Sequence, residues 1–230
     1  MIAIILCGGK GERLRPLTLD IPKPMVRIKE KPIISYILNQ IIHQNINKIF
    51  ISVGYKAKII EDYFKENFLD RNIITINNGD VDIIERIKKV ININPNENEF
   101  LILYGDTVSN VNMNILYNYS KKNEKHSIIT IWPLTTSFGV VEINKQNQVV
   151  GFKEKPKLDK WINIGYIILK RDILGHLNNF SKFEDYLKFC GKNKYFKAYK
   201  HEGEHFTVNT IVELDLAEKN IYKILNKTND

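Results

Sequence analysis

The sequence lacks the features that mark membrane-spanning, disulfide-bonded and metal-cluster proteins. Only two of its 230 residues are cysteines, Cys7 and Cys190. Neither a disulfide framework nor a cysteine metal site is therefore expected, and both thiols should be buried and free, as in the reducing cytosol. The opening apolar run, residues 1–6, is far too short to cross a bilayer and follows no basic segment, which argues against a membrane span and a signal peptide. We expect a cytoplasmic globular protein with no membrane partner.

A stripe of basic residues with interleaved aromatic residues, the usual mark of nucleic-acid binding, is also missing. The formal net charge is +8, yet the lysines are spread along the chain, in runs no longer than those at 88–89 and 121–122. The five histidines show no metal-ligand spacing, and we expect His201 and His205 at the surface. A cationic chain of this kind suits small ligands that carry several phosphates. We therefore expect anionic small molecules, and no nucleic acid, as partners.

Patterns of strands and helices alternate along the first part of the chain, and this alternation is typical of a doubly wound, mainly parallel α/β sheet with helices on both faces. Ligands of such sheets bind at the carboxyl ends of the strands. The strand patterns occupy residues 1–6, 48–53, 72–76, 100–104 and 127–132, and the helix patterns occupy residues 33–44, 56–69 and 113–122.

The second part of the chain is less regular. Residues 138–144 and 149–153 form a predicted β-hairpin, and residues 211–225 form a predicted closing amphipathic helix. The length and the 43% of hydrophobic residues suffice for one domain with a sizeable core. We therefore expect a single domain over residues 1–230 that carries a small β-rich appendage.

The most informative stretch follows the first strand. Gly8, Gly9 and Gly11 leave the backbone free to adopt positive φ and to bring N–H groups close to an anion. Basic residues surround these glycines, and Lys23 lies between two prolines that hold the backbone extended. Such a set suits a triphosphate, although a tight turn with solvated basic residues is the simpler alternative. The spacing fits neither a P-loop nor the dinucleotide fingerprint, which would need a glycine at Leu14.

The whole run from Leu6 to Met25 resembles the signature of the nucleotide-diphosphate-sugar pyrophosphorylases, which are nucleotidyltransferases with a Rossmann-like fold. The resemblance implies that residues 1–125 bind the nucleotide and residues 126–230 the acceptor. It also implies that Arg13 and Lys23 are catalytic, because they neutralise phosphate charge. The nucleotide contacts implied in this stretch are Leu6, Cys7, Gly8, Gly9, Lys10, Gly11, Glu12, Arg13 and Lys23.

Asn77-Asn78-Gly79-Asp80 follows the third predicted strand. By residue type alone this segment is a polar turn. The Pro-Leu-Gly-Thr-type segment of most family members is missing here. A shorter glycine-containing stretch that leads into a helix with residues 86–89 is similar to the cytidylyltransferase branch. That similarity implies that Asn78, Gly79 and Asp80 contact the base of CTP.

Gly105 and Asp106 end a further buried strand. A lone aspartate there could cap a helix or a turn, but Mg²⁺ commonly takes one or two carboxylates together with phosphate oxygens. The run Tyr-Gly-Asp-Thr-Val-Ser resembles the cytidylyltransferase motif in which Asp106 would bind Mg²⁺ and Gly105 would contact the nucleotide. Where that branch carries a second aspartate in Met-Asp-Thr, this chain has Asn209. The resemblance therefore implies a metal site of Asp106 and Asn209 with one carboxylate fewer.

Glu154-Lys155-Pro156 and Asn163-Ile164-Gly165 also resemble the family. Residues 153–157 could otherwise be a solvated charged loop. The resemblance implies that Lys155 and Lys23 bind the acceptor phosphate, while Glu154 and Asn163 contact its organic part. In the second motif the family's middle glycine is replaced by Ile164.

These motifs together indicate transfer of CMP from CTP to a phosphorylated acceptor, with release of pyrophosphate. The compact length is similar to that of the cytidylyltransferases that act on phosphoglutamine in the synthesis of the O-methyl phosphoramidate of capsular polysaccharide. A sugar 1-phosphate is the alternative acceptor. A non-catalytic, nucleotide-binding regulatory subunit is a second alternative, which Asn209 keeps open. The sequence is compatible with a homo-oligomer and does not decide the oligomeric state.

Overall fold

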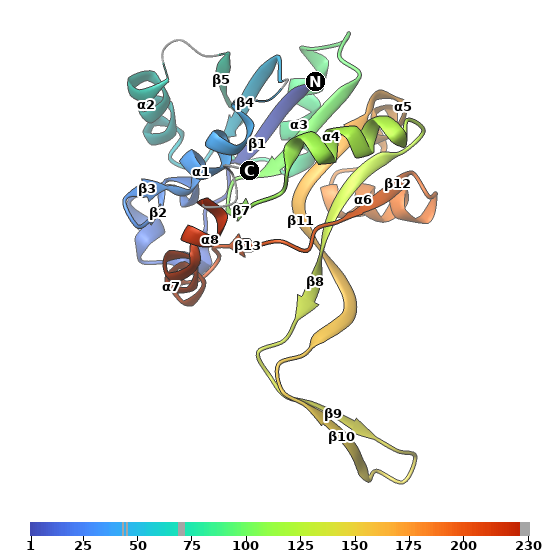
Figure 1. The fold of residues 1–230 in the computed structure, drawn as a ribbon. Coiled ribbons are helices and arrows are strands. Elements are labelled where there is room, and N and C mark those ends of the chain that lie inside the picture. Colours follow the sequence, from blue (N-terminus) through green and yellow to red (C-terminus); the bar gives the residue numbers. More distant parts are fainter. Residues whose placement is uncertain (43, 45, 69–71, 226–230) are drawn as a thin grey trace.

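A seven-stranded sheet forms the centre of the computed structural model, which describes residues 1–42, 44, 46–68 and 72–225 (Figure 1). Only β11 runs antiparallel to its neighbours, and the other paired strands of this sheet are parallel. The predicted mainly parallel sheet is thus confirmed. The strands lie in the order β12 (Phe196–Lys200), β8 (Ser127–Thr135), β11 (Lys157–Lys170), β6 (Glu99–Tyr104), β1 (Ile2–Cys7), β4 (Lys48–Val53) and β5 (Ile73–Asn77).

Helices contribute to two hydrophobic clusters, one on each face of the sheet. Because β1 is a central strand, its successive side chains point alternately into the two clusters, Ile5 into one and Ile4 into the other. One cluster includes residues of α1 (Ile33–Ile41), α2 (Ala57–Asn67), α4 (Met113–Lys122), α7 (Ile211–Asn220) and α8 (Tyr222–Leu225). The other includes residues of α3 (Ile83–Asn92), α5 (Arg171–Leu174) and α6 (Phe183–Lys192).

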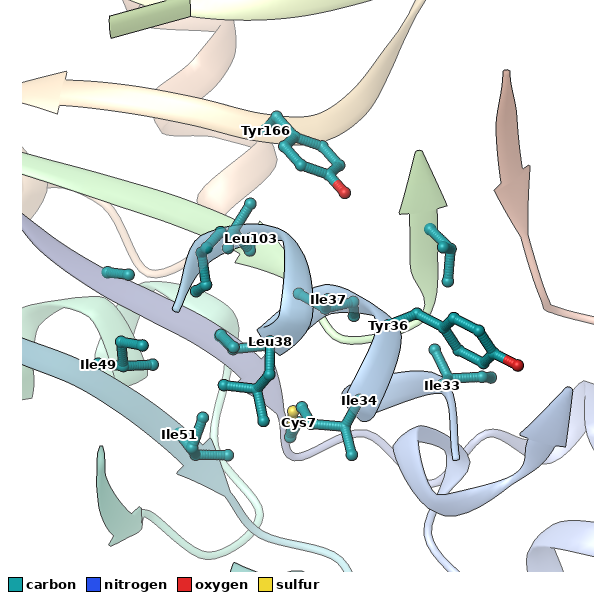
Figure 2. Packing of buried hydrophobic residues seen from close by; sticks show 14 of the residues in the cluster. Cys7, Ile33, Ile34, Tyr36, Ile37, Leu38, Ile49, Ile51, Leu103 and Tyr166 are labelled. Carbon is teal, nitrogen blue, oxygen red and sulfur yellow. The ribbon is translucent and has the colours of Figure 1, made fainter. Parts of the chain in front are cut away.

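Helix α1 shows how the sequence pattern produces this packing. Ile34, Ile37 and Leu38 recur at helical spacing and are at most 1% exposed. Figure 2 shows them in the same cluster as Ile51 of β4 and Leu103 of β6. The helix therefore covers β4 and β6, which flank β1, and the glycine-rich loop follows β1.

Two short antiparallel pairs lie beside the main sheet. The first joins β2 (Arg27–Ile28) to β3 (Lys31–Pro32). The second joins β7 (Thr107–Ser109) to β13 (His205–Thr207), and the backbone N–H of Val208 donates to the Asp106 carbonyl at 3.0 Å. This second pair places the segment around Asn209 beside the carboxyl end of β6.

The predicted hairpin is present as β9 (Val140–Ile143) and β10 (Val149–Lys153). It projects from the body on the outer ends of β8 and β11, at the bottom of Figure 1. In the part of the chain that the structure describes, no helix is both long and apolar enough to cross a membrane.

Several predicted helices differ from the observed ones in their ends. The single closing helix predicted over residues 211–225 is wrong, since α7 ends at Asn220 and α8 is a separate short helix. The predicted helix over 33–44 ends at Ile41, and position 43 lies outside the described residues. The predicted helix over 56–69 corresponds to α2, and position 69 also lies outside them. Helix α6 and strand β12 were not expected from the sequence.

Candidate active site

A cavity of about 730 Å³ lies at the carboxyl ends of β1 and β6. This size suits a small organic ligand, and the position is where doubly wound sheets bind their ligands. Four basic and four acidic side chains take part in its wall, together with the glycine-rich backbone. The lining residues are Leu6, Cys7, Gly8, Gly9, Lys10, Gly11, Glu12, Arg13, Lys23, Pro24, Asp80, Val81, Asp82, Ile83, Arg86, Tyr104, Gly105, Asp106 and Asn209.

Most of the predicted nucleotide-binding residues line this cavity, as do both predicted metal ligands. Of the predicted nucleotide-binding residues, Asn78 and Gly79 do not line it. Of the predicted acceptor-binding residues, Glu154, Lys155 and Asn163 do not line it either. The Nδ2 atom of Asn78 donates to Ser52 Oγ at 2.8 Å, and Asn78 lines a separate cavity of about 560 Å³. The functional roles of all these residues remain predictions.

The glycine-rich loop packs closely against the side chains of Thr18, Lys23 and Arg86. Gly11 has a φ of +64°, a conformation that residues with a Cβ rarely adopt. Its carbonyl accepts a hydrogen bond from Thr18 Oγ1 at 2.9 Å. A Cβ on Gly8 would lie 2.0 Å from Cζ of Arg86. The glycine at position 8 is therefore required by the guanidinium group beneath it.

Arg86 is a site residue that the sequence reading missed, since it was noted only as part of a basic helical segment. Its side chain donates to the carbonyls of Val53 at 2.9 Å, Gly79 at 2.7 Å and Gly8 at 3.5 Å. Arg86 is only 3% exposed, and this burial lowers its pKa. It therefore ties together the segments after β1, β4 and β5. A sequence signal exists, because Arg86 lies four positions before Val90 on the buried face of α3.

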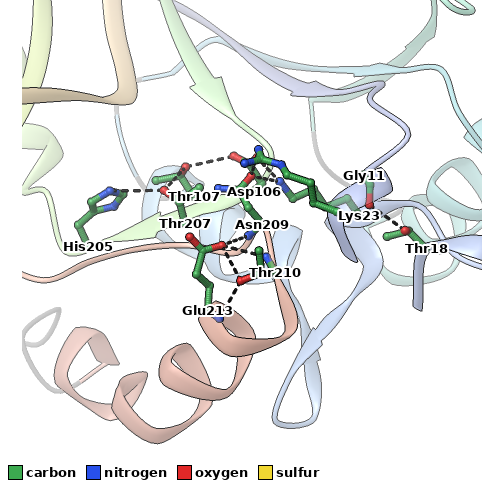
Figure 3. A network of polar contacts seen from close by, with 11 residues as sticks. Gly11, Thr18, Lys23, Asp106, Thr107, His205, Thr207, Asn209, Thr210 and Glu213 are labelled. Atoms are coloured by element: carbon green, nitrogen blue, oxygen red, sulfur yellow. Dashed lines mark hydrogen bonds and ion pairs between the residues drawn. The ribbon is translucent and has the colours of Figure 1, made fainter. Parts of the chain in front are cut away.

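The Lys23 side chain reaches both predicted metal ligands (Figure 3), and Arg13 contacts one of them. Lys23 Nζ lies 2.5 Å from Asp106 Oδ2 and 2.7 Å from Asn209 Oδ1. Arg13 Nη2 also donates to Asn209 Oδ1, at 2.9 Å. The Lys23 and Asp106 side chains are only 13% and 25% exposed, so solvent screens their attraction incompletely. The carboxylate and the amide thus share one cation.

The start of α7 positions Asn209. Thr210 and Glu213 form a capping box at this helix end. The carboxylate of Glu213 also accepts a hydrogen bond from the backbone N–H of Asn209 at 2.7 Å. The pairing of β13 with β7 holds the preceding residues against Asp106. Local capping and strand pairing therefore aim the Asn209 amide at the cavity.

Lys10 and Asp80 form an ion pair across the cavity wall, with 2.8 Å between Nζ and Oδ2. The hydrogen bond lowers the pKa of Asp80 and raises that of Lys10. Their side chains are 49% and 78% exposed, so this pair contributes little to stability. Both groups can therefore exchange partners readily when a ligand enters.

The predicted acceptor residues occupy two different places. Asn163 Nδ2 donates to the hydroxyl of Tyr104 at 3.3 Å, so it adjoins the cavity through a lining residue. Burial raises the pKa of Tyr104 to about 12, which keeps this hydroxyl neutral. Glu154 and Lys155 lie between β10 and β11, at the base of the hairpin, with side chains more than 60% exposed. The structure therefore does not bring this pair to the cavity.

The expectation that His201 and His205 lie at the surface is wrong, because His201 is buried and His205 is partly buried. His201 is 7% exposed, and its Nε2 lies 3.0 Å from Ser109 Oγ. His205 is partly buried against Trp132, and burial lowers its pKa to about 4. The pairing of β13 with β7 encloses both side chains beside the sheet.

Whether Asp106 and Asn209 suit a Mg²⁺ ion depends on the type and arrangement of their side-chain oxygens. Among the described residues no cluster of three or more histidine, cysteine, aspartate or glutamate residues could hold a metal ion. The oxygens of Asp106 and Asn209 nevertheless converge on one ammonium group, which shows that they can meet a single cation. Two oxygen ligands suit Mg²⁺ that is bound mainly through substrate phosphates and water. The residues therefore fit the metal.

The family model described as Nucleotidyl transferase matches residues 2–209. The chain therefore belongs to the nucleotidyl transferase family. The crystal structure of a UDP-glucose pyrophosphorylase has the same fold, with a TM-score of 0.73 over 97% of this chain and 99% of that one, at 22% identity.

Similar proteins include enzymes named for different nucleotides. A D-glycero-alpha-D-manno-heptose 1-phosphate guanylyltransferase of Campylobacter jejuni is 33% identical over 194 residues, which cover 82% of this chain and 85% of that protein. A glucose-1-phosphate cytidylyltransferase of Salmonella typhimurium is 30% identical over 203 residues, with coverages of 78% and 79%. The bifunctional protein GlmU of Methanococcus maripaludis is 33% identical over 189 residues, 80% of this chain. Those residues cover only 44% of GlmU, so this chain spans less than half of that relative.

Proposed function

We propose that this chain transfers CMP from CTP to a phosphorylated small molecule and releases pyrophosphate. The observation that carries the proposal is the convergence of Arg13, Lys23, Asp106 and Asn209 at one end of a cavity built on a glycine-rich loop. A set of cations and side-chain oxygens beside a glycine-rich loop is suited to triphosphate chemistry. Residues 1–125 would bind the nucleotide and residues 126–230 the acceptor.

The proposed reaction needs charge neutralisation more than proton transfer. A phosphate monoester is largely a dianion at neutral pH, so it can attack the α-phosphorus of CTP without a general base. Each pair of like charges about 4 Å apart costs about 4 kcal/mol at an effective dielectric constant near 20. Lys23 and Arg13 would offset this repulsion and hold the reacting groups in line.

Lys23 would bridge the α-phosphate of CTP and the acceptor phosphate, while Arg13 would neutralise the leaving β- and γ-phosphates. Asp106 and Asn209 would hold Mg²⁺, which supplies further positive charge beside the phosphates when it is bound. For that, the ammonium of Lys23 must leave the two oxygens that it contacts in this structure. The released ammonium then faces the phosphates, because Lys23 lines the same cavity.

For the base, we propose cytosine, held near the turn that contains Gly79 and Asp80. Support comes from the cytidylyltransferase relative and from the position of Asp80 in the cavity wall. The Gly79 carbonyl, next to the cavity residue Asp80, accepts a hydrogen bond from Arg86 at 2.7 Å, which restrains this turn. A restrained backbone edge favours recognition of one base over the others.

For the acceptor, a sugar 1-phosphate has the support of two relatives whose names contain such a sugar. Phosphoglutamine is the second candidate, as in the synthesis of capsular phosphoramidate. The departure from the family motif that suggests it is Ile164, which stands in place of a glycine between Asn163 and Gly165; this side chain is 2% exposed and packs in the core. Glu154 and Lys155 remain proposed acceptor contacts. To touch an acceptor bound in the cavity at the ends of β1 and β6, they would have to move toward it together with the base of the hairpin.

Pyrophosphate release tests the proposal. The purified chain would be assayed with each of the four nucleoside triphosphates, together with glucose 1-phosphate or phosphoglutamine, in the presence of Mg²⁺. We expect release with CTP and one acceptor class, and the productive acceptor decides between the two candidates. Nucleotide binding without turnover under every condition would instead support a non-catalytic regulatory subunit.

A further inference from the structure

A second cavity, of about 560 Å³, lies beside helix α3 and outside the site described above. This volume falls in the range of small-molecule sites. Three parts of the chain form its wall: the end of β5 with the turn that follows, one side of α3, and the short helix Gly175–Asn179. We call it the outer cavity. Among the described residues, Val81 alone lines both this cavity and the one at the ends of β1 and β6.

The α3 side of the outer cavity is cationic. Four residues of the helix that line the cavity are spaced by one, three or four positions and so share one side of it: Glu85, Lys88, Lys89 and Asn92. Two ammonium groups and one carboxylate give this wall a net positive charge, because the other lining residues are uncharged. A hollow with such a charge attracts anions.

Both lysines keep donors for a ligand. An ammonium group has three N–H donors. Lys89 Nζ donates to the Asn77 carbonyl at 3.1 Å. Lys88 Nζ donates to Glu85 Oε1 at 2.8 Å and to the Phe180 carbonyl at 3.2 Å. Within the described residues these contacts leave two donors on Lys89 and one on Lys88. The Lys88 side chain is only 16% exposed, so solvent screens its charge less than that of a surface lysine.

The rest of the wall suits hydroxyl groups. Asn92 and Asn178 present side-chain amides, which both donate and accept hydrogen bonds. The Glu85 carboxylate is 51% exposed, and it accepts hydrogen bonds. A hydroxyl group can donate to this carboxylate, whereas a second anionic group beside it would be repelled.

We propose that the outer cavity binds a phosphate monoester of a small hydroxylated molecule. The phosphate would accept hydrogen bonds from Lys88 and Lys89, since charge-assisted hydrogen bonds to phosphate are among the strongest in proteins. The hydroxyl groups of the ligand would meet Glu85 and the two asparagine amides. This site goes beyond the proposed function, and binding there does not depend on it.

The turn over residues 77–81 separates the two cavities. Asn77 and Asn78 line the outer cavity, and Asp80 lines the other one. Val81 lines both. A ligand in the outer cavity therefore contacts the turn that is proposed to hold the base of CTP, and the site would act as an effector site. Any effect of this ligand on CTP affinity is matched by an equal effect of CTP on the ligand. This regulatory role rests on the proposed function.

Titration calorimetry with glucose 6-phosphate tests the site without nucleotide or turnover. We expect the unmodified chain to bind it and Asn92→Asp to raise the dissociation constant at least about tenfold, because this isosteric change adds a negative charge to the wall. Asn118→Asp is the matched control, since it adds the same charge at an exposed position of α4 and should leave the constant unchanged. Lys89→Gln should weaken binding at least about fivefold.

Three results would overturn the site. The first is no binding to the unmodified chain, and the second is unchanged binding in both Asn92→Asp and Lys89→Gln, which would place the phosphate elsewhere. The third is an equal loss in Asn92→Asp and its control.

Two further probes test the chemistry of the ligand. Glucose lacks the phosphate and should not bind in the same concentration range, because the two lysines would have no anion to contact. Inorganic phosphate lacks the hydroxyl groups and should bind at least about threefold more weakly than glucose 6-phosphate. Equal affinity for glucose would overturn the role of the lysines, and equal affinity for inorganic phosphate would overturn the role of the hydroxyl groups.

The dissociation constant for CTP, measured with and without saturating glucose 6-phosphate, tests the link between the cavities. We expect a change of at least about threefold in the unmodified chain and in Asn118→Asp, and none in Asn92→Asp. An unchanged constant in all three proteins would overturn the regulatory role. Failure of every protein to bind CTP would overturn the proposed function and the regulatory role that rests on it, but not the site for the phosphate monoester.

Discussion

The ammonium group of Lys23 lies 2.5 Å from Oδ2 of Asp106, although 83 positions separate the two residues in the chain. The amide oxygen of Asn209 lies on the same ammonium at 2.7 Å. A metal ion bound by Asp106 and Asn209 would meet the same two oxygens. If Asp106 and Asn209 bind the metal, Lys23 and the metal would therefore compete for these oxygens.

Lys23→Met should strengthen metal binding in the absence of nucleotide. The substitution removes a positive charge beside Asp106, and we expect affinity for Mn²⁺, a Mg²⁺ substitute, to rise at least about tenfold. Electron paramagnetic resonance of free Mn²⁺ measures this without any turnover. Lys10→Met is the matched control, because Lys10 pairs with Asp80 instead, and it should change the affinity by less than about threefold. Unchanged or weaker Mn²⁺ binding in Lys23→Met would show that the two cations do not compete.

Asn209→Asp should also strengthen Mn²⁺ binding, for a different reason. The substitution places a second carboxylate at position 209, whose side chain lies on the other side of the Lys23 ammonium from Asp106. Two carboxylates hold a divalent cation better than one carboxylate and one neutral amide. The Mg²⁺ concentration for half-maximal activity should therefore fall. If neither the Mn²⁺ affinity nor the half-maximal Mg²⁺ concentration changed, position 209 would not be a metal ligand.

Arg86→Met should destabilise the fold. It leaves the carbonyls of Val53 and Gly79 without their buried donor, and we expect the free energy of unfolding to fall by about 2–4 kcal/mol. Urea denaturation measures this loss. Arg27→Met removes an exposed arginine that donates to Glu30 and should change stability by less than about 0.5 kcal/mol. Equal stability of both variants would contradict the bracing role of Arg86.

Gly8→Ala should weaken nucleotide binding, because its Cβ would lie 2.0 Å from the Arg86 guanidinium and would displace the loop or the arginine. We expect the dissociation constant for CTP, measured by calorimetry, to rise at least about tenfold. Gly175→Ala is the control, since a Cβ there would meet nothing within 4 Å. Binding of CTP by Gly8→Ala as tight as that of the control would show that the loop can move without loss.

His205 should make stability depend on pH. Burial, followed by the charge of His201, lowers the pKa of His205 to about 4, against a small opposite effect of Asp106. The unfolded chain binds the proton near pH 6.5, so stability is complete above that pH and is lost as the pH falls toward 4. The free energy of unfolding, measured by urea denaturation, should fall between pH 7.5 and pH 4.5. In His205→Gln this fall should be smaller by about 1–3 kcal/mol. An unchanged pH dependence in the variant would contradict this assignment.

The sequence predicts which residues lie at the cavity where the signal is local. Gly8, Gly11 and Asp106 come within four residues of the ends of buried strands, and strand ends of a parallel sheet meet at one edge. Arg86 was missed because its partners, the carbonyls of Gly8, Val53 and Gly79, come from three distant segments. A helical pattern shows that position 86 is on a buried face, but not which carbonyls it meets.

The acceptor side was predicted from resemblance alone, and the structure separates its residues. Asn163 adjoins the cavity through Tyr104, whereas Lys155 lies at the hairpin base. The long β11 that connects them was not expected, because its outer half alternates too weakly to mark a strand. The closing helix was predicted as one unit because Leu214, Ala217 and Ile221 keep helical spacing across the break between α7 and α8.

The central claim is that Lys23 neutralises phosphate charge during nucleotidyl transfer, and the kcat/KM of Lys23→Ala for pyrophosphate release tests it most directly. The variant would be compared with the unmodified chain and with Lys58→Ala, which removes an exposed lysine paired with Asp62 on α2. The account predicts that Lys23→Ala loses at least about 100-fold in kcat/KM, about 2.7 kcal/mol, while Lys58→Ala retains full activity. A Lys23→Ala enzyme within about tenfold of the unmodified chain would contradict the account.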